Sequence, residues 1–188
     1  MIAQIAATQA AGGSVWCGDE TTLREFPPLR AAWAPRGVQQ VVVISGRNAR
    51  RVLHGALNIQ TGHLVRVVRA RNRGGDCAAL VEALAAHCPA GVPHLLIWDN
   101  APPHHTHAAR DAAAAGGIGI GWLPFRSPEL NPCEDVWREM KRVVAANRAY
   151  ADVDEQAARA VAWLDDRSGD ENLHTSGLLS SKFDWLPT

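Results

Sequence analysis

The most constraining feature of this sequence is a fully apolar run that stops abruptly at an acidic residue. Residues 95–98 read Leu-Leu-Ile-Trp and are followed by Asp99, Asn100 and, one residue later, Pro102. An uninterrupted apolar run of this length is typical of a strand that is buried on both faces. In open α/β sheets, ligands bind in the crevice at the carboxyl ends of such strands. We therefore predict an α/β fold in which Asp99 lies at a ligand-binding edge of the sheet.

A second apolar run ends in the same way. Residues 15–18 (VWCG) lead into Asp19, and a third acid, Glu134, lies in the first turn of a predicted helix that Asn131 caps and Pro132 starts. Each acid also has a simpler interpretation, because turn aspartates and an Asn-x-x-Glu capping box are common local structures. Three carboxylates in one crevice repel one another unless cations lie between them. Convergence would therefore indicate a site for Mg²⁺ or Mn²⁺.

The residues around these three acids resemble a known family. GDET surrounds Asp19, WDNAPPHH surrounds Asp99, SPELNPCEDVW surrounds Glu134, and residues 100–133 make a spacing of 34 between the last two acids. The arrangement is similar to the Asp-Asp-Glu triad of insertion-sequence transposases related to mariner elements, which typically show Asn-Pro-x-Glu followed by Trp. Three separated motifs in the right order are a far more specific signal than any one alone. The resemblance covers approximately residues 15–164.

This resemblance implies the catalytic domain of a transposase, which cuts DNA at the ends of a mobile element and joins the released 3′-hydroxyl to target DNA. Asp19, Asp99 and Glu134 would be both catalytic residues and ligands of two Mg²⁺ or Mn²⁺ ions, roughly 3.5–4 Å apart. The partners would be double-stranded DNA, at the element ends and at the target, and a second copy of the chain within the DNA complex. Asp135 points about 100° around the helix from Glu134, and we expect it to be a solvated charge.

The remaining patterns predict a ribonuclease H-like fold, a mixed five-stranded sheet flanked by helices. Further strands are predicted over residues 39–45, 52–59, 63–68 and 118–123, with helices over 76–88, 104–115, from 131 onward and over 153–164. Residues 20–28, which contain Pro27-Pro28, are predicted to be a loop. A chain of 188 residues is long enough for one domain with a substantial core. We expect a lead-in over residues 1–14, the catalytic domain over 15–164 and a C-terminal extension over 165–188 that packs its aromatics or stays mobile.

Charge gives no global attraction to nucleic acid, because 19 basic residues balance 19 acidic ones. Local clusters are more informative, since the planar fork of arginine suits phosphate oxygens, although such residues also occur as solvated edges. The histidines after Asp99 are unpromising ligands for oxygen-preferring ions, and they could instead contact a phosphate or hold the Asp99 loop in place. The candidate nucleic-acid-binding residues are Arg47, Arg50, Arg51, Asn100, His104 and His105.

Several classes are disfavoured. No apolar run approaches the roughly 20 residues needed to cross a bilayer, and no signal peptide is recognisable, so we expect a cytoplasmic protein. The four cysteines show no C-x-x-C spacing, which argues against zinc or a disulfide framework. Only 18 residues precede Asp19, so we expect sequence-specific DNA recognition to be missing from this chain. Two alternatives stay open: a helix-turn-helix protein encoded in a separate or frameshifted reading frame supplies it, or it has been lost.

Two alternative functions remain open. One is another ribonuclease H-like nuclease that acts on hybrid or branched nucleic acid, and the other is a transposase remnant that binds DNA or a partner without cutting.

Overall fold

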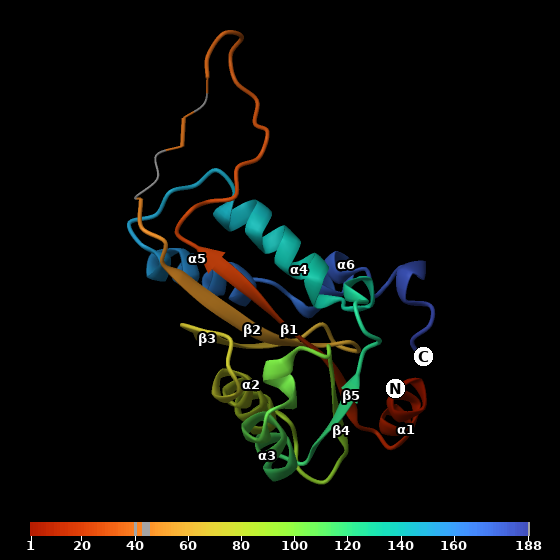
Figure 1. The fold of residues 1–188 in the computed structure, drawn as a ribbon. Helices are drawn as coiled ribbons and strands as arrows, with labels where there is room; N and C mark the ends of the chain where they lie inside the picture. Colours follow the sequence, from red (N-terminus) through yellow and green to blue (C-terminus); the bar gives the residue numbers. More distant parts are fainter. Residues whose placement is uncertain (40, 43–45, 188) are drawn as a thin grey trace.

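The computed structural model describes residues 1–39, 41–42 and 46–187 (Figure 1). Within these residues, five strands form one mixed sheet in the order β3-β2-β1-β4-β5. The strands are β1 (Ser14–Arg24), β2 (Arg50–Asn58), β3 (Leu64–Arg69), β4 (His94–Trp98) and β5 (Ile118–Trp122). β2 is antiparallel to both β1 and β3, whereas β4 is parallel to both β1 and β5. The predicted mixed five-stranded sheet is therefore confirmed.

Helices cover both faces of this sheet (Figure 1). The helices are α1 (Ile2–Ala10), α2 (Gly74–His87), α3 (His107–Ala115), α4 (Cys133–Met140), α5 (Val153–Asp165) and α6 (Gly169–Ser176). α2 and α3 pack on one face, around a core that includes Trp98, and α4 and α5 pack on the other, around a core that includes Trp137. A π-helical turn over Lys141–Ala145 continues α4.

The two faces divide the residues of β1 between them. Val15 and Cys17 belong to the core under α4 and α5, whereas Trp16 belongs to the core under α2 and α3. Successive side chains of a strand point to opposite faces. The adjacent acids Asp19 and Glu20 therefore lie on different sides of the sheet.

The structure corrects the predicted course of the chain after Asp19. β1 continues to Arg24, so Asp19 lies within a strand rather than at its end, and the predicted loop over residues 20–28 is wrong for residues 20–24. The reason is pairing, because β2 pairs with β1 from Trp16 as far as Arg24 despite the polar composition of this stretch. Of the predicted strand over 39–45, residues 39, 41 and 42 have no regular secondary structure, and the others lie outside the described residues.

Both ends of the chain pack onto the same core. Ile5 of α1 belongs to the core under α4 and α5, and Trp185 and Leu186 near the C-terminus pack against that core. α6 was not predicted from the sequence, yet it has clear end signals, since Ser168 and Glu171 form a capping box and Gly177 ends the helix with a φ of 78°. Residues 165–187 thus contain a helix, and Trp185 packs against the core, whereas the sequence predicts an extension that packs its aromatics or stays mobile.

Candidate active site

Asp19, Asp99 and Glu134 line one cleft with a volume of about 250 Å³. They come from three separate elements, namely the middle of β1, the residue after β4, and the first turn of α4. The structure thus brings together the three acids that the sequence singled out. A larger groove of about 780 Å³, lined by Tyr150 and Trp163 among others, contains none of them. The chemistry of its lining, rather than its size, marks the smaller cleft as the candidate site.

Asn131 fixes the start of α4 against β1. Its Nδ2 donates to the backbone oxygen of Gly18 at 3.0 Å, and its Oδ1 accepts from the backbone N–H of Cys133 at 3.1 Å. α4 therefore begins one residue later than predicted, with Asn131 still supplying the capping oxygen. Because Gly18 directly precedes Asp19, this contact sets the distance between β1 and the turn that carries Glu134.

Asp19 is a buried carboxylate with one oxygen that lacks a hydrogen-bond partner among the described residues. Its Oδ2 atom is buried and has no hydrogen-bond partner there. Burial raises the pKa of Asp19 well above its usual value, and repulsion from the nearby Glu134 raises it further. A buried anion in this state is stabilised by a cation, which is the role that a metal ion would fill.

The Asp99 carboxylate, unlike that of Asp19, is stabilised by hydrogen bonds. Its Oδ1 lies 2.7 Å from Nδ1 of His104 and also accepts from the backbone N–H of Ala101 at 3.0 Å. The hydrogen bond from His104 lowers the pKa of Asp99. Burial alone would lower the pKa of His104, but hydrogen bonds to Asp99, Cys77 and Glu20 outweigh burial and raise it to about 11. Asp99 is therefore a stabilised anion at the mouth of the cleft.

The residues after Asp99 do not all face the cleft as expected. Asn100 lines it and donates from Nδ2 to the backbone oxygen of Leu123 at 2.6 Å. His104 is 0% exposed, so the predicted contact between His104 and DNA is wrong, and the alternative that it holds the Asp99 loop agrees with its hydrogen bonds. His105 stacks on Trp122 with ring centroids 4.0 Å apart.

The three candidate arginines lie away from the cleft. Arg47 contacts Glu25 at 2.8 Å, and Arg51 contacts Asp154 at 2.6 Å. Arg50 pairs with Arg24 at the far ends of β2 and β1. None of the three lines the cavity that contains the acids. A contact between these arginines and DNA remains a prediction, and it would have to involve DNA that extends beyond the cleft.

Asp135 is not the solvated charge that the helical angle suggested. Its side chain is 13% exposed and makes ion pairs with Arg138 and with Lys182, the latter at 2.5 Å. The C-terminal segment, which supplies Lys182, covers this side of α4. Asp135 does not line the cleft that contains the three acids.

Two candidate functional residues near the acids are absent from the sequence motifs. Lys141 lies seven residues after Glu134, two helical turns along, and lines a neighbouring pocket rather than the cleft itself. Burial lowers the pKa of Lys141, while the negative charges of Glu134 and Asp19 oppose that shift. The i, i+7 spacing could have signalled it. Phe125 on the rim of the cleft is 80% exposed. The next residue, Arg126, has a φ of 57°, a strained backbone that no sequence pattern announces.

The donor set suits a hard divalent cation. Three carboxylates from three elements, one of them with an orphaned buried oxygen, match the oxygen preference of Mg²⁺ and Mn²⁺. Among the described residues, no three His, Cys, Asp or Glu side chains are already spaced to hold a metal ion. The carboxylates therefore line the cleft without closing on a common point.

Comparisons with known proteins agree with this geometry. The family described as DDE superfamily endonuclease matches residues 14–156, a stretch that includes all three acids. A curated relative, "Uncharacterized protein y4pE/y4sA" of Sinorhizobium fredii (strain NBRC 101917 / NGR234), is 38% identical over 65 residues, which is 35% of this chain and 46% of the relative. The chain thus aligns with about half the length of that relative.

Solved structures of Mos1 transposase share the fold. The crystal structure of its catalytic domain has a TM-score of 0.66 at 12% identity and covers 97% of this chain and 85% of that one. The Mos1 mariner paired-end complex with Mn has a TM-score of 0.69 at 12% identity, over 98% of this chain and 61% of that one. The paired-end complex with the left transposon end has a TM-score of 0.66 at 14% identity, over 94% and 56%. This likeness confirms the predicted ribonuclease H-like architecture.

In the described part of the chain, no helix is both long and apolar enough to span a membrane.

Proposed function

Because this chain belongs to the DDE superfamily of endonucleases, we propose that it is the catalytic part of a transposase, which cuts DNA at the ends of a mobile element and joins them to a target. The observation that carries this proposal is the single cleft lined by Asp19, Asp99 and Glu134. The substrate would be double-stranded DNA. The solved Mos1 structures include a paired-end complex and a strand transfer complex, and we propose by analogy that two copies of this chain act together on DNA.

The three acids would hold two divalent ions. When bound, such ions activate the attacking oxygen and neutralise the charge that develops on the phosphate and the leaving group. Asp19, whose buried Oδ2 lacks a partner among the described residues, and the stabilised anion of Asp99 would hold the ions together with Glu134 from α4. Two solved Mos1 paired-end complexes contain Mn and Mg, respectively, which supports the choice of metal.

Residues around the acids would bind and orient the DNA. The ammonium group of Lys141 lies within the field of Glu134 and Asp19, so it would balance a phosphate brought to the cleft. Phe125, on the rim, presents an exposed ring on which an unpaired base could stack. Asn100 holds the start of this rim through its hydrogen bond to Leu123. A helix-turn-helix protein that recognises the element ends stays a prediction from the sequence.

Cutting can be tested on a supercoiled plasmid with Mn²⁺. Wild-type protein should nick the plasmid, whereas Asp19→Ala, Asp99→Ala and Glu134→Ala should each reduce nicking to background, because each removes a metal ligand. Asp111→Ala is the matched control, since Asp111 is an exposed acid of α3 outside the cleft. Nicking that survives in the three cleft variants would contradict the proposal.

A second assay separates the alternatives. An oligonucleotide with a free 3′-hydroxyl should become joined to the plasmid, which a simple nuclease would not achieve. Faster cutting of an RNA–DNA hybrid than of the duplex of the same sequence would favour the other ribonuclease H-like nuclease. Binding without cutting of either substrate would favour a transposase remnant.

A further inference from the structure

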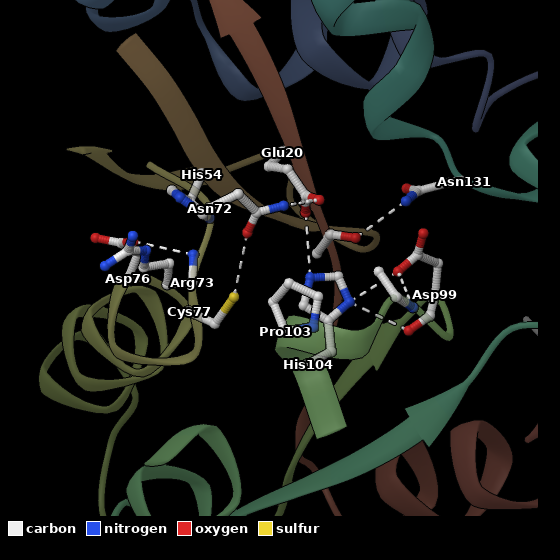
Figure 2. Close-up of polar contacts among 12 residues, drawn as sticks. Glu20, His54, Asn72, Arg73, Asp76, Cys77, Asp99, Pro103, His104 and Asn131 are labelled. Carbon is white, nitrogen blue, oxygen red and sulfur yellow. Dashed lines mark hydrogen bonds and ion pairs between the residues drawn. The ribbon is translucent and has the colours of Figure 1, made fainter. Parts of the chain in front are cut away.

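His104 forms a buried bridge between the two faces of the sheet. The ring is fully buried and stacks on Trp98, with centroids 4.1 Å apart and planes 8° from parallel. Its Nδ1 faces Oδ1 of Asp99 at 2.7 Å, and its Nε2 faces Oε2 of Glu20 at 3.1 Å. Figure 2 shows the ring between these two carboxylates. With both nitrogens facing carboxylate oxygens and one face packed on an indole, the orientation of the ring is fixed.

The far end of this bridge is anchored as firmly as the ring. Glu20 accepts from Nδ2 of Asn72 at 2.5 Å through Oε1, while its Oε2 faces His104. Asn72 in turn accepts a hydrogen bond from the thiol of Cys77 in α2, at 3.6 Å. Both oxygens of Glu20 are therefore engaged on the α2 side of the sheet. Glu20 thus serves as an anchor, although it directly follows Asp19 in sequence.

The sheet itself does not hold the Asp99 side chain. β1 and β4 pair in parallel up to Cys17 and Ile97, and the same register continued by two residues would place Asp19 opposite Asp99. However, β4 ends at Trp98, so Asp99 lies one residue beyond regular structure. The contact between His104 and Asp99 takes the place of the missing strand pairing. His104 is itself held by Glu20, the immediate neighbour of Asp19.

We propose that His104 is a positioning residue that sets the place of the Asp99 carboxylate relative to Asp19, with Glu20 and Asn72 as its anchor. The inference rests on the proposed function, because the spacing of these two acids matters only if they share a metal site. The ring itself touches neither DNA nor metal, since it is fully buried behind Asp99. Groups that orient metal ligands in this way commonly affect metal affinity by about 10–100-fold when removed.

Two isosteric variants separate positioning from packing. The amide nitrogen of Asn in His104→Asn takes the place of Nδ1 and keeps the contact with Asp99, whereas that of Gln in His104→Gln takes the place of Nε2 and keeps the contact with Glu20. Each variant loses one ring contact and the stacking on Trp98, so a merely structural role predicts equal effects. The measurement is Mn²⁺ affinity of the DNA-free protein, from the electron paramagnetic resonance signal of unbound Mn²⁺, together with the melting temperature.

We expect His104→Gln, which loses the contact with Asp99, to weaken Mn²⁺ binding by about 10–100-fold. His104→Asn keeps that contact and loses only the anchor on Glu20, so it should weaken Mn²⁺ binding less. Equal affinities in the two variants, or a weaker His104→Asn, would overturn the inference. If both variants fail to fold, Asn72→Ala tests the anchor from a distance, because Asn72 contacts Glu20 but no proposed metal ligand. That variant should also weaken Mn²⁺ binding, and unchanged affinity would overturn the inference.

The outcomes also distinguish this inference from the proposed function. Wild-type protein that nicks DNA, combined with His104 variants of equal Mn²⁺ affinity, would remove the positioning role and leave the function intact. Wild-type protein that neither takes up Mn²⁺ nor nicks DNA would overturn both.

Discussion

Replacing the two aspartates of the cleft by asparagine should change the stability of the metal-free protein in opposite directions. Asp19→Asn and Asp99→Asn are a matched pair, since each removes one negative charge from the same cleft and preserves the shape of the side chain. The buried Oδ2 of Asp19 has no partner among the described residues, so neutralising Asp19 should raise the melting temperature. Asp99 accepts hydrogen bonds from His104 and Ala101, so neutralising Asp99 should lower it.

The size of the Asp99 effect follows from its contacts. Hydrogen bonds to charged groups contribute about 1.5–3 kcal/mol, and the lower end applies because the Asp99 side chain is 50% exposed. For a domain of this size, a loss near 1.5 kcal/mol lowers the melting temperature by about 3–6 °C. Mn²⁺ at about a hundredfold above its dissociation constant should stabilise the wild type by about 2.7 kcal/mol. Both variants should reduce that gain, because each removes a ligand.

The pH dependence of stability provides a second, independent test of the two variants. The pKa of Asp19 is raised in the folded protein, so the stability that it contributes is present below its usual pKa and is lost as pH rises through the folded value. The pKa of Asp99 is lowered, so its contribution is present above the usual value and is lost as pH falls through the folded one. The advantage of Asp19→Asn over wild type should therefore grow with pH.

The assay is thermal unfolding followed by circular dichroism, in chelator and then in Mn²⁺, from pH 4 to pH 8. If Asp19→Asn were clearly less stable than wild type throughout this range without metal, the description of Asp19 as an uncompensated anion would be refuted. A stabilising Asp99→Asn would refute the importance of the His104 contact in the same way.

Three further predictions concern other parts of the site. Lys141→Ala should weaken binding of duplex DNA in low salt and reduce the salt dependence of binding, whereas Lys141→Arg should keep both, as measured by fluorescence anisotropy. Phe125→Ala should weaken binding of DNA with an unpaired base by about 1–3 kcal/mol and binding of intact duplex much less. The fluorescence of 2-aminopurine at the unpaired position should show no stacking in the variant, and equal losses for both DNAs would argue against stacking. Asp135→Ala should lower the melting temperature slightly, because it breaks the ion pair with Lys182, and should leave nicking intact; loss of nicking would make Asp135 part of the site.

Much of the fold could be predicted from local patterns. The apolar runs that became β2, β3, β4 and β5 carry their own signal, because a buried strand needs a continuous or alternating apolar face. The continuation of β1 beyond Asp19 could not be predicted in this way. Its polar residues form a strand because they pair with β2, and local composition does not reveal pairing between distant segments. The polar composition of residues 165–188 predicts an extension without a helix, whereas the capping box of Ser168 and Glu171 is the local signal for α6.

The candidate site, like the fold, could be predicted from the sequence only in part. The acids and their spacing were visible in the sequence, and so was the suspicion that a histidine holds the Asp99 loop. The electrostatic state of each acid was not visible, because it depends on partners distant in sequence. Repulsion among the three acids, taken alone, would make neutralisation of Asp99 stabilise the metal-free protein, whereas the contact with His104 reverses the sign of this effect. The lack of compensation belongs instead to Asp19.

The division of β1 between two faces makes the register of this strand a functional property. Asp19 and Glu20 carry the same charge and are separated by one peptide bond, yet only one of them lines the cleft. A deletion of one residue between Ser14 and Asp19 that kept the upstream pairing would move Glu20 into the place of Asp19, facing α4, and turn Asp19 toward the other face. The shifted chain would still present a carboxylate to the cleft, but one with a longer stem, and Thr21 would take the place that Glu20 holds opposite His104. Substitution tolerance in this strand should therefore exceed tolerance to any change in its length.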